Sequence, residues 1–591
     1  MARERPRRLP RDAPRALAAD RHPRRARRPR RGIPRVRAVA RHWRHAGAVQ
    51  PPVHCIHDGE AVRERGQSLH GCPARNLPGL LLLAPYRPRP QRPRCVHRLA
   101  VLRLHRGVLR QVRLAGVRPR LRECSARSLR AAGTRILRRQ EPRCLMTRWR
   151  NWAGTVRARP RNMHAPRSVE ELQGIVAGAR DNQRIRMAGS GHSFTAIVPS
   201  NDILLLPHDF GDGIGIDSTR MVARIPAGMV LHEANQRLAA AGYALANMGD
   251  ITAQTMAGSI STSTHGTGSA FTGLAGQVAS FTLVTADGEL RECSPAQNED
   301  IWRLGRVGLG ALGILTHVDM RIVPAFRLRA VEEPRRLDAV LGNFDSTVTT
   351  ADHFEFYWVP HTRWALTKHN TRTNDPAQPR TAFAKWMSKT VLENYAFGAV
   401  CAVGRAVPPL IPRLATALPS SGRSEFVEAS HEVFATRRLV KFHEMEYSIP
   451  RARLVEAMTG IVEMVQREKL RISFPVEVRT TAPDDVALST SYGRESAYIA
   501  VHMYKGMPYE RYFRLVESIV APLEGRPHWG KLHHLSANEL APRYERFAEF
   551  VELRERLDPQ RRFVNGYVER VLGLPTSRGS NVARHETAAR S

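Results

Sequence analysis

Hydrophobic and polar positions follow helical and strand periods from about residue 150 onward. Ser168 stands before an apolar helical period and Glu171 follows three residues later, which predicts a helix with a capping box that ends near Arg180. Short runs of β-branched and other apolar residues predict strands. The predicted strands of this region are 185–187, 203–206, 221–225, 278–285, 289–293 and 315–322, and a second predicted helix is 230–241.

The same periods continue after residue 325 and define a second region. Its predicted strands are 354–359, 471–474 and 497–504, and its predicted helices are 453–468, 509–520 and 543–557. Helices and strands mix throughout, which is typical of the α+β class. We expect one domain over residues 150–325, a second over 326–572, and a disordered Gly-, Ser- and Arg-rich tail over 573–591.

The most apolar local stretch is Asn394–Leu418. Arg405 and the prolines at 408, 409 and 412 interrupt it, so it does not predict a membrane-spanning helix. Two interpretations are open, a helix buried in the core and a helix that lies on a membrane surface. We expect a cytoplasmic protein, with peripheral membrane contact as the alternative, because no secretory signal follows Met146.

Charge is distributed unevenly along the chain. Residues 1–145 hold 38 Arg, no Lys and 8 Asp or Glu, whereas residues 146–591 hold 54 Lys or Arg and 46 Asp or Glu. Arg, Pro, Ala and Gly have G+C-rich codons, so an Arg-rich segment without Lys is typical of a G+C-rich gene translated in a wrong frame. We therefore interpret residues 1–145 as a mistranslated or disordered extension and expect the native protein to begin at Met146.

Two other interpretations of residues 1–145 are open, an RNA-binding tail and an Arg-rich transit peptide. The first makes nucleic-acid binding the alternative function from another class. We expect no nucleic-acid partner, because charge is nearly balanced in the rest of the chain. Five of the seven cysteines also lie in this segment, and the other two, Cys293 and Cys401, suit a reducing compartment. We expect no metal site.

The most informative motif is Gly189-Ser190-Gly191-His192-Ser193, directly after the strand predicted at 185–187. Two glycines let the backbone approach a ligand closely, and consecutive N–H groups in such a turn can bind a pyrophosphate. His192 then lies beside the same ligand. Alone, these five residues are equally compatible with a tight turn that carries a surface histidine.

Further motifs follow in order along the chain. Glu477 and Arg479 alternate along a strand-like run and therefore project from one face. Taken singly, Glu477 and Arg479 are more typical of an exposed ion pair, Lys531 of a surface lysine and His502 of a core histidine. The other motifs are Asn247–Asp250, a stretch of small and hydroxyl residues over 255–268, Val307–Ile314, Val501–Tyr504, Pro527–Lys531 and Leu557–Tyr567.

Together these motifs resemble the vanillyl-alcohol-oxidase group of flavoproteins, which carry the p-cresol-methylhydroxylase (PCMH) type of FAD-binding domain. Within that group they resemble the sugar-1,4-lactone oxidases and dehydrogenases, which act on L-gulono- or D-arabinono-1,4-lactone, and the related alditol oxidases. The resemblance covers about residues 150–572. It implies a two-subdomain FAD-binding domain, followed by an α+β substrate domain whose C-terminal segment returns to the FAD side.

The resemblance also implies the cofactor and its site. FAD would be joined covalently to the protein through His192, with its pyrophosphate on the surrounding loop. Gly249 implies room for O₂ beside the flavin, whereas Asp250 departs from the serine of alditol oxidases. The implied cofactor-binding residues are Gly189, Ser190, Gly191, His192, Ser193, Gly249, Asp250, Thr255, Gly258, Thr262, Ser263, Thr264 and His265.

By the same resemblance, Glu477, Arg479, Lys531 and His502 face the substrate. Hydride would pass from a substrate C–H group to the flavin. Arg479 and Lys531 would stabilise negative charge, Glu477 would orient hydroxyl groups and accept a proton, and His502 is a secondary candidate for proton transfer. Tyr504 replaces the threonine of alditol oxidases, so a sugar lactone is favoured over a linear polyol. The electron acceptor would be O₂, a cytochrome or a quinone.

Overall fold

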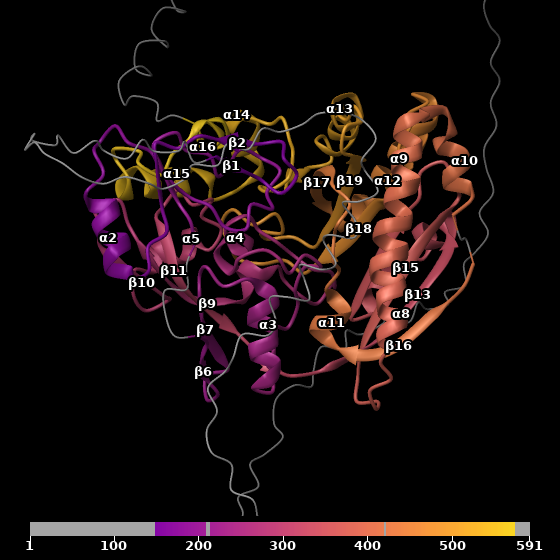
Figure 1. Cartoon of the computed structure of the whole chain (residues 1–591), viewed down its shortest axis with the longest axis horizontal. Helices are drawn as coiled ribbons and strands as arrows, with labels where there is room; N and C mark the ends of the chain where they lie inside the picture. Colours follow the sequence, from indigo (N-terminus) through magenta and orange to yellow (C-terminus); the bar gives the residue numbers. More distant parts are fainter. Residues whose placement is uncertain (1–147, 208–212, 419–420, 574–591) are drawn as a thin grey trace, which may run out of the picture. The chain divides into compact units, whose positions relative to one another are not determined.

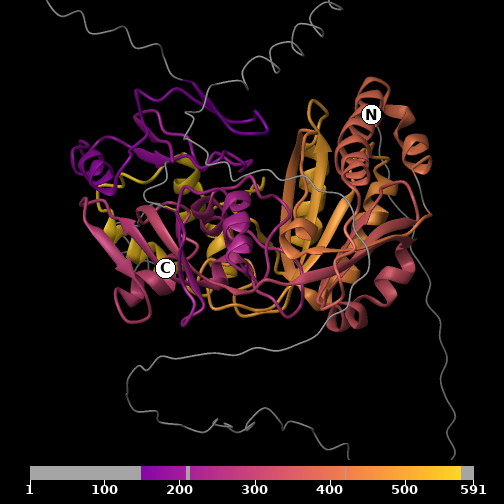
Figure 2. The same cartoon turned by 60° about the horizontal axis from the view of Figure 1, so that its bottom comes forward.

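The computed structural model describes residues 148–207, 213–418 and 421–573, shown from two directions in Figures 1 and 2. The extension predicted at 1–145 and nearly all of the tail predicted at 573–591 lie outside these residues. Within them, helices and sheets mix along the whole chain, which confirms the predicted α+β class. The predicted boundary near residue 325 falls between two large sheets, which lie to the left and right in both views.

A small parallel sheet follows a hairpin of β1 (Trp149–Arg150) and β2 (Arg157–Ala158). Its strand order is β3 (Asn162–His164), β5 (Ile203–Leu205) and β4 (Ile185–Met187), and α2 (Val169–Ala177) packs on it. Ser168 caps α2, because its Oγ accepts the N–H of Glu171 at 3.2 Å. The carboxylate of Glu171 accepts the N–H of Arg167 instead of that of Ser168, so only half of the predicted capping box forms.

The next sheet is antiparallel and has five strands. Their order is β10 (Leu290–Cys293), β9 (Val278–Val284), β11 (Ile314–Arg321), β7 (Val222–Pro226) and β6 (Gly215–Asp217). Alternate side chains of β11 are buried, as the two-residue period of a strand requires. The other elements of this region are α3 (Leu231–Ala240), β8 (Tyr243–Ala244), α4 (Met256–Ser261), η1 (Leu274–Gln277), α5 (Glu299–Gly305) and β12 (Val323–Pro324).

The third sheet is antiparallel and has eight strands. Their order is β16 (Ser424–Ala429), β13 (Arg327–Arg336), β15 (Trp364–Thr373), β14 (His353–Trp358), β18 (Val476–Thr481), β19 (Ser496–Tyr504), β17 (Phe442–Pro450) and β20 (Arg526–Pro527). Its register sets Tyr357 opposite Glu477 and Glu444 opposite His502. Directly opposed residues share a face of a sheet, so polar side chains from four strands gather on one face.

Helices cover this sheet, and the α-helices among them contribute to one large core. They are α6 (Leu337–Gly342), α7 (Phe344–Thr350), α11 (Ser430–Phe434), η4 (Arg451–Arg453), α12 (Leu454–Arg467) and α13 (Glu510–Val520). In α12 the buried residues recur at helical spacing, with Leu454, Met458, Ile461 and Val465 facing the core.

The C-terminal segment returns to the small parallel sheet. It contains α14 (Ala537–Leu540), η5 (Ala541–Arg543), α15 (Phe547–Leu557) and α16 (Gly566–Leu572), which lie beside α2 and the β1–β2 hairpin in Figure 1. The N–H of Ile185 donates to the carbonyl oxygen of Arg562 at 2.7 Å, and the side chain of Asn565 donates to that of Ala196 at 3.0 Å. The last residues therefore fix the loop that follows β4.

A column of helices stands against the eight-stranded sheet. It contains α8 (Ala382–Trp386), the π-helix η2 (Met387–Ala396), α9 (Phe397–Ala406), η3 (Pro408–Leu410) and α10 (Ile411–Thr416). Cys401 and Ile411 are buried, whereas Tyr395, Val403 and Val407 are exposed. The prediction that Asn394–Leu418 is a helix buried in the core is therefore wrong for one face of these helices, which is exposed. No described helix is long and apolar enough to cross a bilayer.

The strand predicted at 471–474 is also wrong. Those residues are irregular, and β18 begins only at Val476, after Pro475. The strands β13, β15, β16 and β17 were not predicted. They carry many charged residues, and β17 buries Glu444 and Glu446, so hydrophobic alternation does not mark it.

Candidate functional site

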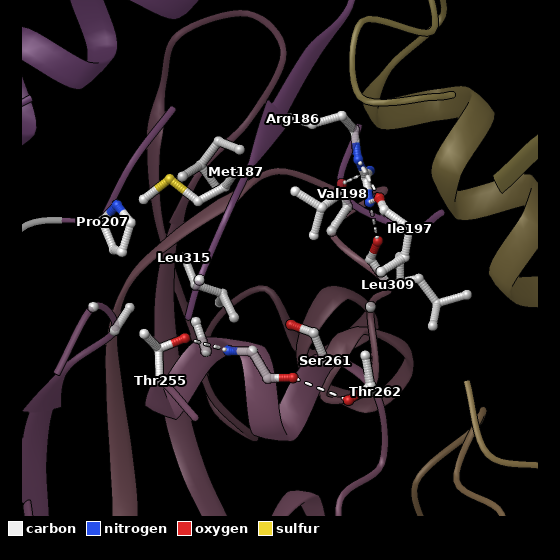
Figure 3. Close-up of a pocket in the computed structure, with 18 of the residues that line it drawn as sticks. Arg186, Met187, Ile197, Val198, Pro207, Thr255, Ser261, Thr262, Leu309 and Leu315 are labelled. Carbon is white, nitrogen blue, oxygen red and sulfur yellow. Dashed lines mark hydrogen bonds between the residues drawn. The ribbon is translucent and has the colours of Figure 1, made fainter. Parts of the chain in front are cut away.

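A cleft lies between the small parallel sheet and the five-stranded sheet, and we name it the glycine cleft (Figure 3). It holds about 1080 Å³ of empty space, including its opening to solvent. Its walls contain much backbone, because many of the lining residues are glycines or small residues. The lining residues include Gly189, Ser190, Gly191, His192, Ser193, Thr255, Gly258, Thr262, Gly308, Gly310 and Gly313.

The loop Gly189–Ser193 presents its backbone to the glycine cleft. Within the described ranges, none of its five N–H groups donates a hydrogen bond to the protein. The loop is held from its two ends: Ala188 N–H donates to Leu205 at 2.8 Å, and Phe194 N–H donates to Gly530 at 2.7 Å. Consecutive N–H groups without a protein partner bind anions, so this loop fits a pyrophosphate.

Close packing explains why glycine is needed in this loop. A Cβ added at Gly189 would lie 2.5 Å from Oγ1 of Thr255, and Gly191 has a φ of +71°. Thr255 caps α4, because its Oγ1 accepts the N–H of Gly258 at 3.2 Å. Thr262 closes the same helix by donating to the carbonyl oxygen of Gly258 at 3.0 Å.

Arg186 ties the walls of the glycine cleft together. Its buried guanidinium donates to the carbonyl oxygens of Ile197, Leu309, Gly310 and Phe563 at 2.6 to 3.0 Å, and Figure 3 shows part of this set. Burial lowers the pKa of Arg186 to about 10, although Asp558 opposes the shift. One side chain on β4 therefore joins Ile197, which follows the Gly189–Ser193 loop, to the Val307–Ile314 segment and the C-terminal segment.

Ser263 is placed elsewhere. It lines neither the glycine cleft nor the two pockets described next, and its φ is +62°. Its Oγ lies 3.3 Å from Oγ1 of Thr490. The structure therefore does not place Ser263 in the walls of these pockets, although its neighbours Thr262 and Thr264 line them.

His192 lies where the glycine cleft meets a small second pocket, which also contains Trp152, Thr262, Phe442 and Lys531. Its ring stacks on Trp152, with the centroids 5.6 Å apart. Burial lowers the pKa of His192 to about 4, and the charge of Lys531 adds to the shift. The imidazole is therefore neutral near pH 7, which is the form with a nucleophilic nitrogen.

The third pocket, which we name the charged pocket, opens from the small pocket through Phe442 and Lys531. One wall of this pocket is aromatic and consists of Phe397, Phe442 and Phe474. The pocket holds about 890 Å³ of empty space, including its opening to solvent. All four predicted catalytic residues line it, together with four predicted cofactor residues. These eight are Glu477, Arg479, His502, Lys531, Gly249, Asp250, Thr264 and His265.

Arg479 is the centre of one buried cluster in the charged pocket. It contacts Glu477, and its Nε lies 2.8 Å from Glu355 and its Nη2 3.5 Å from Asp250. Arg438 also binds Asp250, at 2.8 Å. Burial would raise the pKa of Asp250, but Arg479 and Arg438 outweigh it and hold that pKa below its usual range. Asp250, which stands where alditol oxidases carry serine, thus completes a network that binds two arginines.

Glu477 differs from the other carboxylates of this cluster. Burial raises the pKa of Glu477 above the ordinary value. Arg479 opposes this shift, but burial outweighs it together with the negative charges of Asp250 and Glu355. Tyr357 OH lies 3.3 Å from Glu477 Oε1. Among the carboxylates bound to Arg479, Glu477 therefore takes up a proton most readily.

Lys531 and His502 share a second carboxylate. Glu444 Oε1 contacts Lys531 and lies 3.4 Å from Nε2 of His502, whose Nδ1 is 3.0 Å from the carbonyl oxygen of Pro475. Burial would raise the pKa of Glu444, but Lys531 and His502 outweigh it and lower the pKa to about 2. Both nitrogens of His502 face oxygen acceptors, so this ring is poorly placed to accept a substrate proton.

Several residues of the site were missed from the sequence. They are Trp152, Glu355, Tyr357, Arg438, Glu444, Glu446 and His528. His528 stood inside a quoted motif, but the others lie on strands or loops without a chemical signature.

Tyr504, in contrast, does not line the charged pocket; it lies against Phe474 and beneath Arg405. Its difference from alditol oxidases therefore does not act on the pocket wall directly.

Comparisons with known proteins match this arrangement. A family model described as FAD binding domain matches residues 160–294, and one described as D-arabinono-1,4-lactone oxidase matches residues 318–571. The chain is 38% identical to L-gulono-1,4-lactone dehydrogenase from Mycobacterium tuberculosis, over 72% of this chain and 99% of that protein. It is 33% identical to L-gulonolactone oxidase from Scyliorhinus torazame (71% and 97%) and 30% identical to alditol oxidase from Streptomyces sp. (71% and 98%).

The solved structures share the fold. Cholesterol oxidase from Brevibacterium sterolicum superposes with a TM-score of 0.61 at 16% identity, over 72% of this chain and 96% of that one. This confirms the predicted PCMH-type fold. The family match also confirms FAD as the cofactor class, and the unpaired N–H groups of the glycine cleft fit its pyrophosphate.

Proposed function

Because this chain belongs to the family of FAD-dependent sugar-1,4-lactone oxidases and dehydrogenases, we propose that it oxidises L-gulono- or D-arabinono-1,4-lactone at a CH–OH group. The 2-keto product would enolise to an ascorbate-type enediol. The observation that carries the proposal is the junction at His192: a cleft with unpaired backbone N–H groups meets the small pocket there, and the small pocket leads on to the charged pocket that contains Glu477, Arg479 and Lys531.

We assign the nucleotide part of FAD to the glycine cleft and its flavin to the side of His192 and Thr264. FAD supplies the acceptor for the hydride. His192 would form the covalent bond to the flavin, since its imidazole is neutral and stands at the junction. Acid precipitation tests this bond: flavin should remain with the precipitated protein.

The residues of the charged pocket would have separate roles in the reaction. Arg479 and Lys531 would stabilise negative charge on the substrate oxygen as the C–H bond breaks. Glu477 would accept the hydroxyl proton, because it is the carboxylate whose pKa is raised. The geometry favours Glu477 over His502 for this step. The aromatic wall excludes water from one side of the pocket.

We propose O₂ as an electron acceptor, with a cytochrome or a quinone as the alternative. Gly249 lines the charged pocket, and a Cβ there would lie 3.0 Å from the carbonyl oxygen of His265. A methyl group at this position would press on the backbone of His265, so glycine is the residue that fits this part of the pocket wall. Turnover measured in air and then anaerobically with an artificial acceptor separates the two cases.

A substrate panel tests the reaction itself. The proposal expects turnover of L-gulono- or D-arabinono-1,4-lactone, and little turnover of xylitol or sorbitol at equal concentration. The 30% identical alditol oxidase makes linear polyols the second candidate substrates. Preferential turnover of polyols would replace the lactone proposal with that one, and turnover of neither class would contradict both.

We further propose that the protein works in the cytoplasm and contacts the surface of an anionic membrane. Seven of the nine large hydrophobic side chains that are exposed in the described ranges lie on the helix column or beside it; Phe383 is 67% and Tyr395 65% exposed. Leu439 belongs to this set, because its N–H bonds to Asn394 in η2. The seven are Phe383, Trp386, Leu392, Tyr395, Val403, Val407 and Leu439. Such a patch supports an interaction surface.

Positively charged side chains at one end of this patch indicate which kind of partner it binds. Arg405 on α9 donates to the carbonyl oxygen of Lys505. Three further cations, Lys441, Arg150 and Arg157, are close enough to Lys505 to repel its positive charge. An apolar helix face next to clustered Lys and Arg matches an anionic lipid surface. The same helix column lines the charged pocket through Phe397, so the membrane would lie close to the substrate site.

Sedimentation with vesicles tests the surface. The full chain should bind phosphatidylcholine vesicles that contain phosphatidylglycerol, and W386S/Y395S should weaken binding. The matched control is L290S/V455S, which removes exposed apolar side chains elsewhere. Residues 1–145 are common to all three proteins, and sedimentation is compared at a salt concentration that screens the attraction of their Arg residues to the vesicles. Equal binding by both double variants would contradict the proposal.

A further inference from the structure

A row of polar side chains crosses four adjacent strands of the eight-stranded sheet. The register sets Glu477 on β18 opposite Tyr357 on β14, and Glu355 on β14 opposite Lys368 on β15. Lys368 in turn stands opposite Glu332 on β13. Tyr357 and Glu355 are two residues apart on one strand, so all five side chains share one face of the sheet. The row leads away from the charged pocket toward the edge strand β16.

The inner half of this row is joined by hydrogen bonds. Tyr357 OH lies 3.0 Å from Glu355 Oε1 and 3.3 Å from Glu477 Oε1. Arg479 donates to the Tyr357 oxygen at 3.4 Å and to Glu355 at 2.8 Å, and so holds both in place. A phenolic hydroxyl can accept one hydrogen bond while it donates another. Tyr357 therefore connects the two carboxylates.

A fourth pocket, which we name the outer pocket, lies at the outer half of the row. It shares Arg479 with the charged pocket, and Glu355, Lys368 and Glu332 also line it. It holds about 370 Å³ of empty space, including its opening to solvent. The exposed fraction of the side chain rises along the row, from 8% for Glu477 and 11% for Glu355 to 26% for Glu332.

The outer pocket is suited to water. Nζ of Lys368 lies 3.9 Å from Glu355 and 3.8 Å from Glu332, which is too far for direct hydrogen bonds and a spacing that water can bridge. A polar space with several charged partners takes up water. The row therefore connects the charged pocket with solvent.

The proposed reaction needs such an exit. The hydride carries two electrons and one hydrogen nucleus away from the substrate carbon, so the hydroxyl proton is left on Glu477. Glu477 is buried, and bound product together with the aromatic wall would close the charged pocket in front of it. Until the proton leaves, Glu477 cannot accept another one.

We propose that Tyr357 and Glu355 relay the substrate proton from Glu477 to water in the outer pocket. Glu477 gives its proton to the Tyr357 oxygen while the Tyr357 hydroxyl gives its own proton to Glu355. Glu477 ends as a carboxylate, Tyr357 as a neutral phenol and Glu355 as a carboxylic acid. Glu355 then passes the proton to water, and the Tyr357 hydroxyl turns back. The relay rests on the proposed function, which leaves the proton on Glu477.

The charges around the relay favour release at its outer end. Burial would raise the pKa of Glu355, but Arg479 and Lys368 outweigh it and lower that pKa. Glu355 therefore holds a proton only in passing. Burial and the charge of Glu355 raise the pKa of Tyr357 well above its ordinary value, so Tyr357 exchanges one proton for another and stays neutral.

Anaerobic mixing tests the relay by timing proton release against flavin reduction. The protein is mixed with L-gulono- or D-arabinono-1,4-lactone in weak buffer that contains a pH-indicator dye. In the unaltered protein, the proton should appear in step with the loss of visible flavin absorption. In Y357F, which keeps the ring beneath Lys368, the flavin should be reduced at a similar rate, whereas the proton should appear about tenfold to a hundredfold more slowly.

Further variants separate a relay from a structural role. E355Q breaks the next link and should delay the proton in the same way, and Y357F/E355Q should delay it no further, because both changes interrupt one path. The matched control is Y447F, which removes a hydroxyl bound to Glu517 away from these pockets and should delay nothing.

The outcomes distinguish the relay from the reaction. A proton that appears together with flavin reduction in Y357F would overturn the relay, as would equal slowing of both signals in that variant. An unaltered protein that reduces its flavin and releases no proton would overturn it too. A flavin that stays oxidised with both lactones would refute the proposed function, and the relay with it.

Infrared spectra test the first link without turnover. At acid pH, the unaltered protein should show the band of a protonated carboxyl group that E477Q lacks. Y357F should shift this band, because Glu477 loses the hydroxyl that lies 3.3 Å away, and Y447F should leave it in place. The same band position in Y357F and in the unaltered protein would overturn the link between Tyr357 and Glu477.

Discussion

The glycine cleft and the charged pocket are built in different ways. The cleft is walled by the backbone of short segments, with five N–H groups from one loop and glycines where a Cβ would collide. The charged pocket is walled by side chains from separate strands, and almost every charged group in it touches a group of opposite sign. One site therefore depends on space and the other on balanced charge.

This difference sets how each region should respond to substitution. Filling the glycine cleft should reduce cofactor binding and leave the rest of the fold in place. Removing a charge from the charged pocket leaves its partner buried without compensation, so it should affect chemistry and stability together.

The largest expected effect is that of R479M. Glu477, Glu355 and Asp250 would lose their shared partner, so kcat/KM should fall about a thousandfold or more, and the free energy of unfolding should drop by about 3–5 kcal/mol. Steady-state kinetics and urea unfolding measure the two effects. The matched control is R329M, since Arg329 also binds two carboxylates but on the surface. Equal losses in both proteins would refute the central role of Arg479.

The next effect concerns pH. If Glu477 accepts the substrate proton, it must be ionised, so kcat/KM should rise with pH through a pKa above the usual value for glutamate. E477Q should lose about a hundredfold or more in kcat and lack this acid limb. A profile from pH 4 to 8 for both proteins checks the prediction, and the same acid limb in E477Q would show that another group is responsible.

In the glycine cleft, G189A should reduce flavin content. Its Cβ would lie 2.5 Å from Thr255 Oγ1, and overpacking of about 1–3 kcal/mol weakens binding by roughly tenfold. Adding T255A should restore part of the flavin, whereas T255A alone reports the lost helix cap. G174A is the control, because nothing lies within 4 Å of a Cβ there. Flavin content is read from the visible absorption of purified protein.

The smallest effect is expected at the junction of the two regions. If His192 is bonded to the flavin as proposed, H192A should release its flavin on acid precipitation, and the loss of that bond should lower the flavin potential and reduce kcat by about tenfold. W152F keeps an aromatic ring beside His192 and serves as the control. Flavin that stays attached in H192A would assign the bond to another residue.

The same contrast explains what the sequence predicted. Gly189–Ser193 is contiguous, and the role proposed for it follows from backbone geometry, so the motif and the strand before it were found from the residues alone. The helix capped by Ser168 and the strands of β7, β9 and β11 were found in the same way, because their periods are local.

The charged pocket was only partly predictable. Glu477 and Arg479 were found as a pair, because alternation on one strand is local. Their partner Glu355 lies more than a hundred residues away on β14, and only the register of the eight-stranded sheet brings it near. Glu444 and Glu446 are buried charges on a strand that hydrophobic alternation does not mark, so no local pattern predicted them.

Anaerobic mixing with L-gulono-1,4-lactone and with D-arabinono-1,4-lactone tests the central claim most directly. The claim is that the glycine cleft holds FAD and the charged pocket presents a lactone to it. The account predicts that the visible absorption of the bound flavin disappears in a single turnover with at least one lactone, and that R479M slows this step. A flavin that stays oxidised with both lactones, in protein that a chemical reductant can bleach, would contradict the account.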